Sequence, residues 1–180
     1  MEDILILVDD EDNEIGYNKK MDVHIKGQLH RAFSLFIYDK TQKKLLLHKR
    51  AIGKYHSGGL WTNSCCSHPR KGELLINSVI RRTNDELGID IQEFEKNLIE
   101  IGKFHYYKKF KYCAENEIDH VFVLILDVQP ILNINQEEVA DFKWNSIDEI
   151  DSELEEKPHY FTAWFPEAYK IFKNNLVHNN

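Results

Sequence analysis

The apolar run at residues 121–126 constrains the fold of this chain more than any other segment. It reads Val-Phe-Val-Leu-Ile-Leu, so the side chains on both of its faces are apolar. Successive side chains of a strand point to opposite faces, and a strand without polar positions is typical of the centre of a sheet that is covered on both sides. The run therefore predicts a central strand with packed layers above and below it.

The other patterns predict an α+β domain around this strand. Helical spacing of apolar residues follows Glu73 and stops at Gly88, and a capping box begins a second helix at Ser146. A last helix should start near Thr162 and end near Lys173. We expect turns at residues 9–20 and 108–116, and strands at residues 4–8, 32–38, 45–48, 98–107, 118–128 and 142–144. The irregular order of strands and helices favours a mixed β-sheet core with helices packed on it.

Length and charge narrow the class of protein. A chain of 180 residues, 42% hydrophobic, suits a single compact domain over residues 1–180, with its core at about 20–173. A net charge of −7 argues against a nucleic-acid partner. No apolar run reaches the roughly 20 residues that span a bilayer, so no membrane partner is expected. The acidic start and three cysteines without a disulfide pattern favour the cytoplasm. Oligomeric state is left open between a monomer and a weak homodimer.

Residues 61–73 carry the reactive groups of the chain. They read Trp-Thr-Asn-Ser-Cys-Cys-Ser-His-Pro-Arg-Lys-Gly-Glu, a poor helix and a poor strand, so we expect an ordered loop between a strand and the first long helix. In an extended chain Cys65 and Cys66 point in opposite directions, and only one of them can face a site. A metal-bound histidine and a helix N-terminus nearby would favour the Cys66 thiolate. The alternative is a small buried hydrophobe.

A candidate metal site comes from five scattered residues. Three histidines could supply imidazole, and two glutamates at i and i+2 would face one side of a strand. Three imidazoles and two carboxylates fill five positions of an octahedral ion and leave one open. The alternative is ordinary surface histidines, because the chain has nine. The five residues are His24, His30, His68, Glu115 and Glu117.

A second polar group surrounds the predicted helix that ends at Gly88. Arg82 and Glu86 are four residues apart, so a solvated salt bridge is one interpretation. The functional interpretation is that Glu86 holds a divalent cation while Arg82 contacts a phosphate. Three further basic residues in turns or loops would complete an anion pocket: Lys20, Arg50 and Lys54.

Taken together, these residues resemble the type I isopentenyl-diphosphate isomerases, which are members of the Nudix superfamily. The resemblance rests on residues 29–34, 61–69, 81–88, 115–117 and 160–164, and spans about residues 20–170. In the frame of the superfamily's loop–helix signature, Ser67 stands in place of the leading glycine. Arg82 stands where hydrolases carry a metal-binding glutamate. This exchange removes a ligand and repels a cation, which favours an isomerase.

The resemblance implies a reaction and a set of roles. Isopentenyl and dimethylallyl diphosphate would be interconverted by a 1,3-allylic proton shift through a tertiary carbocation, with this small-molecule diphosphate as the partner. Cys66 would be the catalytic thiol, Glu117 the catalytic carboxylate and Tyr106 its assistant, while Trp164 would face the cation. The five-residue site would hold Mn²⁺ or Mg²⁺, although Zn²⁺ also fits, and Glu86 would hold Mg²⁺ that arrives with the diphosphate. The diphosphate contacts would be Lys20, Arg50, Lys54 and Arg82.

Three alternatives accompany this interpretation. A Nudix pyrophosphohydrolase of a nucleoside diphosphate derivative would release phosphate or a nucleotide. A non-catalytic module would bind metal and diphosphate without depending on Cys66. Trp164 could simply be a core aromatic, since it shares helical spacing with Ala168 and Phe172.

Overall fold

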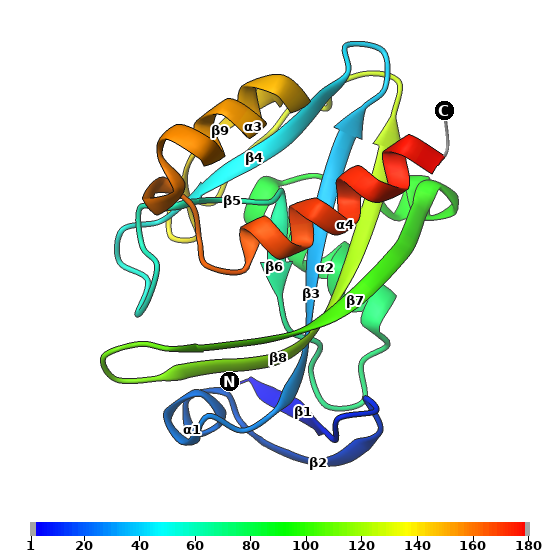
Figure 1. Ribbon diagram of the computed structural model, residues 1–180. Helices are drawn as coiled ribbons and strands as arrows, with labels where there is room; N and C mark the ends of the chain where they lie inside the picture. Colours follow the sequence, from blue (N-terminus) through cyan, green and yellow to red (C-terminus); the bar gives the residue numbers. More distant parts are fainter. Residues whose placement is uncertain (1–2, 179–180) are drawn as a thin grey trace.

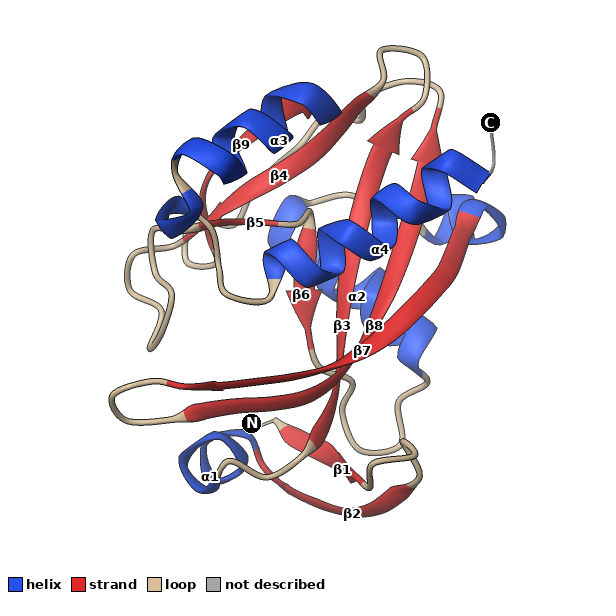
Figure 2. Cartoon of the chain, in the orientation of Figure 1, coloured by secondary structure: helices blue, strands red, loops and turns tan. Residues whose placement is uncertain are grey.

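The computed structural model describes residues 3–178 (Figure 1). The strands of this range belong to one mixed sheet, and the helices lie against it (Figure 2). The strands are β1 (Ile4–Val8), β2 (Glu14–Lys19), β3 (His30–Asp39), β4 (Lys44–Arg50), β5 (Trp61–Thr62), β6 (Cys65–Ser67), β7 (Leu98–Lys109), β8 (Ala114–Leu126) and β9 (Val139–Ser146). The helices are α1 (Lys20–Lys26), α2 (Leu75–Leu87), α3 (Ile147–Glu156) and α4 (Phe165–His178), with 3₁₀ turns η1 (Gln92–Asn97) and η2 (Pro158–Tyr160).

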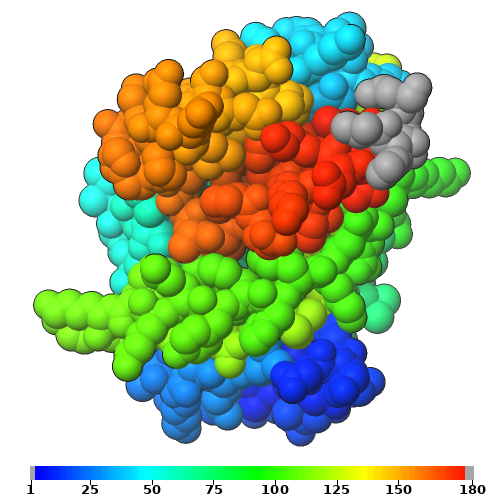
Figure 3. Space-filling model, viewed as in Figure 1, coloured from blue at the N-terminus to red at the C-terminus, as the bar shows by residue number. Residues whose placement is uncertain are grey.

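Strands β3 and β8 form the centre of the sheet. They run parallel and stay in register from His30 opposite Glu117 to Asp39 opposite Leu126. On the other edge of β3, strand β6 pairs antiparallel, with Ser34 opposite Cys66. Strand β7 pairs antiparallel with β8 and extends it into a long hairpin, which projects from the body of the molecule in Figure 3. The site residues of three separate segments are thereby brought side by side.

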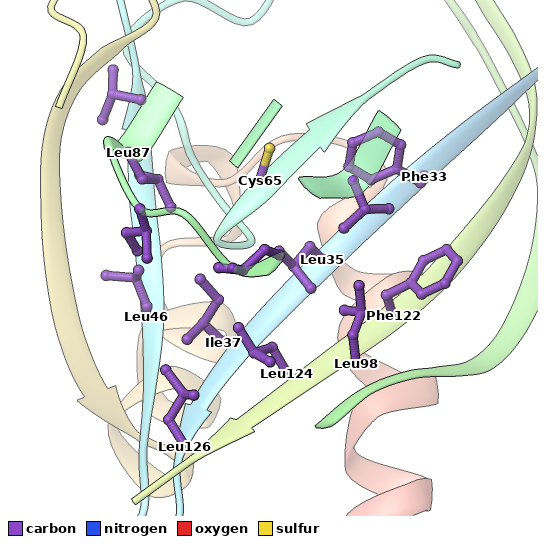
Figure 4. Packing of buried hydrophobic residues seen from close by; sticks show 14 residues of the cluster. Phe33, Leu35, Ile37, Leu46, Cys65, Leu87, Leu98, Phe122, Leu124 and Leu126 are labelled. Carbon is purple, nitrogen blue, oxygen red and sulfur yellow. The ribbon is translucent and has the colours of Figure 1, made fainter. Parts of the chain in front are cut away.

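Helices cover the two faces of the central strands, as residues 121–126 predict. One face carries Phe33, Leu35 and Leu124, which pack in the same cluster as Leu87 of α2 (Figure 4). The other face carries Phe36, Val121 and Val123, which pack against Phe165 and Phe172 of α4. Each buried aromatic side chain of this size contributes a few kcal/mol to stability by leaving water. His30 and Ser34 lie on the same side of β3 as Phe36, so the candidate active site described below is on this second face.

Several predicted elements are confirmed. Strand β1 has the expected bounds, and β3 and β4 cover the expected strands at residues 32–38 and 45–48 and pair antiparallel with Tyr38 opposite Leu45. Gly88 ends α2 with a positive φ of 67°, the left-handed conformation that glycine adopts without strain. Ser146 caps α3, accepting a hydrogen bond from the Glu149 backbone while the Glu149 carboxylate accepts one from the Ser146 backbone. No helix within residues 3–178 is long and apolar enough to cross a membrane.

Other expectations are wrong at the level of local structure. Residues 14–19 were expected as turns but form strand β2, because they pair with β1. Residues 20–26 form α1, a helix for which no element was predicted. Residues 65–67 form β6 where a loop was expected. The turn expected over residues 108–116 is shorter, so Glu115 lies on strand β8. Helix α4 begins at Phe165 and not near Thr162, and it continues to His178.

Candidate active site

One pocket collects most of the residues singled out in the sequence. It is lined by residues from β3, β4, β6, β8 and α2, by the loop after β4, and by Trp164 ahead of α4. The chain folds this way because β3 holds β6 on one edge and β8 on the other, and α2 follows β6 after a short connection. The predicted residues that line it are Lys20, Arg50, Lys54, Cys66, His68, Arg82, Glu86, Glu115, Glu117 and Trp164.

The five predicted metal ligands converge beside this pocket. One potential ligand atom from each of His24, His30, His68, Glu115 and Glu117 lies within 4.8 Å of the others. Nδ1 of His24 lies 2.6 Å from the Lys20 carbonyl oxygen, and Nδ1 of His30 lies 2.9 Å from the Gln28 carbonyl oxygen. If each Nδ1 donates to its carbonyl, Nε2 of both rings is left as an unprotonated ligand. Within residues 3–178 these two Nε2 atoms are buried and make no hydrogen bond.

The electrostatics of this cluster suit a divalent cation. Burial, reinforced by the neighbouring His24, lowers the pKa of His30 to about 4, and burial likewise holds the pKa of His68 well below its usual value. Neutral imidazoles are the form that binds metal. Burial and the charge of Glu115 raise the pKa of Glu117. Burial would also raise the pKa of Glu115, but hydrogen bonds with neighbouring residues hold it below its usual value. The nitrogen and carboxylate donors fit Mn²⁺, Mg²⁺ or Zn²⁺.

Cys66 faces the pocket and Cys65 does not. Cys65 is fully buried in the α2 face of the core, whereas Cys66 is half-buried and lines the pocket, as the alternation of an extended strand predicts. The surroundings of Cys66 in this structure favour the protonated thiol over the thiolate. Burial raises the pKa of the Cys66 thiol to about 12 despite the nearby Arg50. Cys66 is therefore a neutral thiol.

Basic residues gather at one end of the pocket and are partly paired. Arg82 lies 2.6 Å from Glu86 and 3.3 Å from Glu138, and Lys54 also pairs with Glu138. The Arg82–Glu86 pair is not the solvated surface bridge considered above, because both side chains are largely buried at the pocket. Burial and the charge of Arg82 lower the pKa of Lys20. This end presents a cationic surface suited to a diphosphate.

Trp164 lines an aromatic part of the pocket, and Tyr106 packs behind its ring. Trp164 is only 5% exposed, and its Nε1 donates to Asn63 Oδ1 at 3.3 Å. Its ring meets the Tyr106 ring edge to face at 6.1 Å and lies 5.3 Å from the Arg50 guanidinium. Tyr106 stands directly opposite Glu117 in the β7–β8 ladder, so both side chains share one face. Trp164 is buried and lines the pocket, whereas Ala168 and Phe172, which share its helical spacing, pack in the core on the α4 side.

Three functional candidates were missed in the sequence. Asp119 follows Glu117 on the same face of β8, accepts a hydrogen bond from Ser34 at 2.8 Å, and has its pKa raised by burial to about 7. Glu138 and His56 also line the pocket. The Glu-x-Glu-x-Asp pattern could have revealed Asp119. No local pattern distinguishes the other two.

The fold and the comparison with known families define the class of protein. Residues 28–165 match the NUDIX domain family. The structure of DR0079 from Deinococcus radiodurans is similar over 94% of this chain and 98% of that one, with a TM-score of 0.74 at 15% identity, and a MutT protein from Methanosarcina mazei has a TM-score of 0.61 at 17% identity. At these identities the likeness concerns the fold alone. The structure is thus a Nudix fold, and it carries a His/Glu cluster.

Curated relatives narrow this class further. An isopentenyl-diphosphate Delta-isomerase 2 of Photorhabdus laumondii is 45% identical over 92% of this chain and 89% of its own length. An isopentenyl-diphosphate Delta-isomerase of Photobacterium profundum is 40% identical over 98% of this chain and 97% of its own. The chain belongs to the isopentenyl-diphosphate Delta-isomerase family within the Nudix superfamily.

Proposed function

We propose that the protein interconverts isopentenyl and dimethylallyl diphosphate by a 1,3-allylic proton shift. The observation that carries this proposal is the placement of two proton-carrying groups on either side of β3. Cys66 on β6 and Glu117 on β8 both line the pocket, between a cationic end and an aromatic side. A small diphosphate with an apolar tail would place its phosphates at the cationic end and its tail at the aromatic side.

The reaction needs a proton donor and a proton acceptor at different carbons. Adding a proton to the terminal methylene carbon of isopentenyl diphosphate leaves a tertiary cation at the adjacent carbon. Removing a proton from the methylene carbon on the other side of that cation gives the dimethylallyl isomer, so atoms and charge balance. Cys66 and Glu117 fill these two roles, and the direction of the reaction decides which of them donates. Tyr106, opposite Glu117 in the ladder, would assist that carboxyl group.

Metal ions supply charge at two points of the site. His24, His30, His68, Glu115 and Glu117 would hold one divalent ion, Mn²⁺ or Mg²⁺, and such an ion makes a carboxyl group a stronger acid. Glu86 would hold Mg²⁺ that enters with the diphosphate. Arg82, Lys54, Lys20 and Arg50 would bind the phosphate oxygens.

The pocket must also protect the cation from water. The buried indole of Trp164 offers a π face that stabilises a nearby cation without reacting with it, by roughly 0.5–2 kcal/mol. A closed, dry site strengthens this interaction.

A direct assay tests the proposal. Purified protein incubated with isopentenyl diphosphate and Mg²⁺ should form the dimethylallyl isomer, which NMR distinguishes by its single internal double bond, and Cys66→Ala should form none. Arg82→Glu should weaken substrate binding without creating hydrolysis. Release of inorganic phosphate or pyrophosphate without isomer formation would instead identify a hydrolase.

A further inference from the structure

His56 is a buried residue in the loop between β4 and β5 that the site described above does not use. It is 8% exposed and lines the pocket although it lies in a glycine-containing loop. Burying an imidazole is costly unless its nitrogen atoms are satisfied. Its contacts therefore show what holds it there.

The first contact is with a residue of the metal cluster. Nε2 of His56 lies 2.5 Å from Oε1 of Glu115, while the other oxygen of Glu115, Oε2, lies 3.4 Å from Nε2 of His24. One oxygen of this carboxylate thus faces His56 and the other faces His24. The second ring nitrogen, Nδ1, lies 3.1 Å from the Ser57 hydroxyl.

The second set of contacts is aromatic. The His56 ring stacks on Phe110 at the tip of the β7–β8 hairpin, with centroids 4.6 Å apart and planes 22° apart. It also meets the Trp164 ring edge to face at 6.0 Å. The loop that carries Lys54 is thereby joined to the hairpin and to the aromatic side of the pocket.

We propose that His56 is a positioning residue that orients Glu115 as a metal ligand. By its contact with Oε1, the His56 ring turns Oε2 toward His24 and limits the rotation of the carboxylate. Partners that fix a ligand in this way raise metal affinity. The same ring anchors the loop of Lys54, so the metal centre and the diphosphate end of the pocket share one support. The inference rests on the metal site of the proposed function, and it concerns metal binding before any substrate is present.

The test is Mn²⁺ affinity by titration calorimetry in the absence of substrate. His56→Phe keeps the aromatic stack and removes the nitrogen that faces Glu115, so Mn²⁺ affinity should fall by about 10–100-fold. His56→Gln, whose amide can donate to Oε1, should recover much of that loss. The melting temperature of metal-free His56→Phe should stay close to that of the wild type, because the ring and its packing are retained.

Phe110→Leu is the matched control. It removes the stacking partner of His56 and leaves the contact with Glu115, so Mn²⁺ affinity should stay within about two-fold of the wild type. Unchanged affinity in His56→Phe, or an equal loss in Phe110→Leu, would overturn the proposal. Because no substrate is used, this outcome is separate from the isomerase assay: a protein that forms no dimethylallyl diphosphate could still show the predicted loss of affinity.

Discussion

Trp164→Phe separates stabilisation of a cation from ordinary packing. Phe keeps an aromatic ring ahead of α4 but has the weaker π face, so stabilisation of a cation in the pocket should fall by about 1 kcal/mol, which corresponds to about a five-fold loss in kcat. The loss belongs in kcat because the tertiary cation exists only near the transition state. The Arg50 guanidinium, 5.3 Å from the indole, would also lose part of its support, so KM should rise modestly.

The structure limits the expected loss of stability. The hydrogen bond from Trp164 to Asn63 is long at 3.3 Å, and the same Asn63 oxygen also accepts a 2.8 Å hydrogen bond from Thr62. Removing the indole N–H therefore leaves no unsatisfied acceptor and should cost about 0.5 kcal/mol. The smaller ring adds a void, and together the two effects should lower the free energy of unfolding by about 1–2 kcal/mol. The melting temperature would then fall by about 3–6 °C.

Trp144→Phe is the control for this experiment. Trp144 is partly buried on β9 and packs against the α2-side core, away from the residues that line the pocket. Its replacement should lower the melting temperature to a similar extent and leave kcat unchanged. If Trp164→Phe lost stability in the same way but kept kcat within a factor of two, the indole would be structural and the reasoning refuted.

Three further outcomes are expected. Cys66→Ala should abolish turnover with little change in melting temperature, whereas Cys65→Ala should stay active but lose about 1–2 kcal/mol, because Cys65 is fully buried in the core; the reverse pattern would exchange their roles. Asp119→Asn should gain stability relative to the wild type as pH rises from about 4 to about 7. In this range the unfolded wild type releases the proton of Asp119, whereas the folded wild type keeps it because burial raises the pKa of Asp119 to about 7. A difference in stability that does not change with pH would contradict this prediction. Chelation should lower the melting temperature and Mn²⁺ should restore it, since a ligand that binds only the folded state stabilises it.

Elements with a strong local signal could be predicted from the sequence. The apolar run in β8, the spacing and glycine stop of α2 and the capping box of α3 each depend on residues close together in the chain. Strand β2 has mostly exposed side chains, and it is a strand because β1 offers it hydrogen bonds. Helix α1 has only seven residues, too few for a clear period. Contacts with neighbouring elements, and not a local sequence pattern, determined the structure of β2 and α1.

The features of the candidate site also differ in how far the sequence could predict them. The metal cluster could be predicted from a family resemblance, and the turn of Cys66 toward the pocket from simple alternation. The state of that thiol could not, because its pKa depends on burial by segments distant in sequence. His56 and Glu138 were missed for a related reason. Each lies in an irregular segment, and its importance comes from partners distant in sequence: Glu115 for His56, and Arg82 and Lys54 for Glu138.

The parallel pairing of β3 with β8 has a consequence for how the protein is made. Ser34 and Asp119, joined by a hydrogen bond across this seam, are 85 residues apart. Pairings of such high contact order form late, because a long loop must close before they contribute any stability. A nascent chain that has emerged only as far as β7 already carries three histidines of the metal cluster but neither of its glutamates. Metal binding at the proposed site would therefore become available only when β8 docks against β3, so metal loading would report on this step of folding.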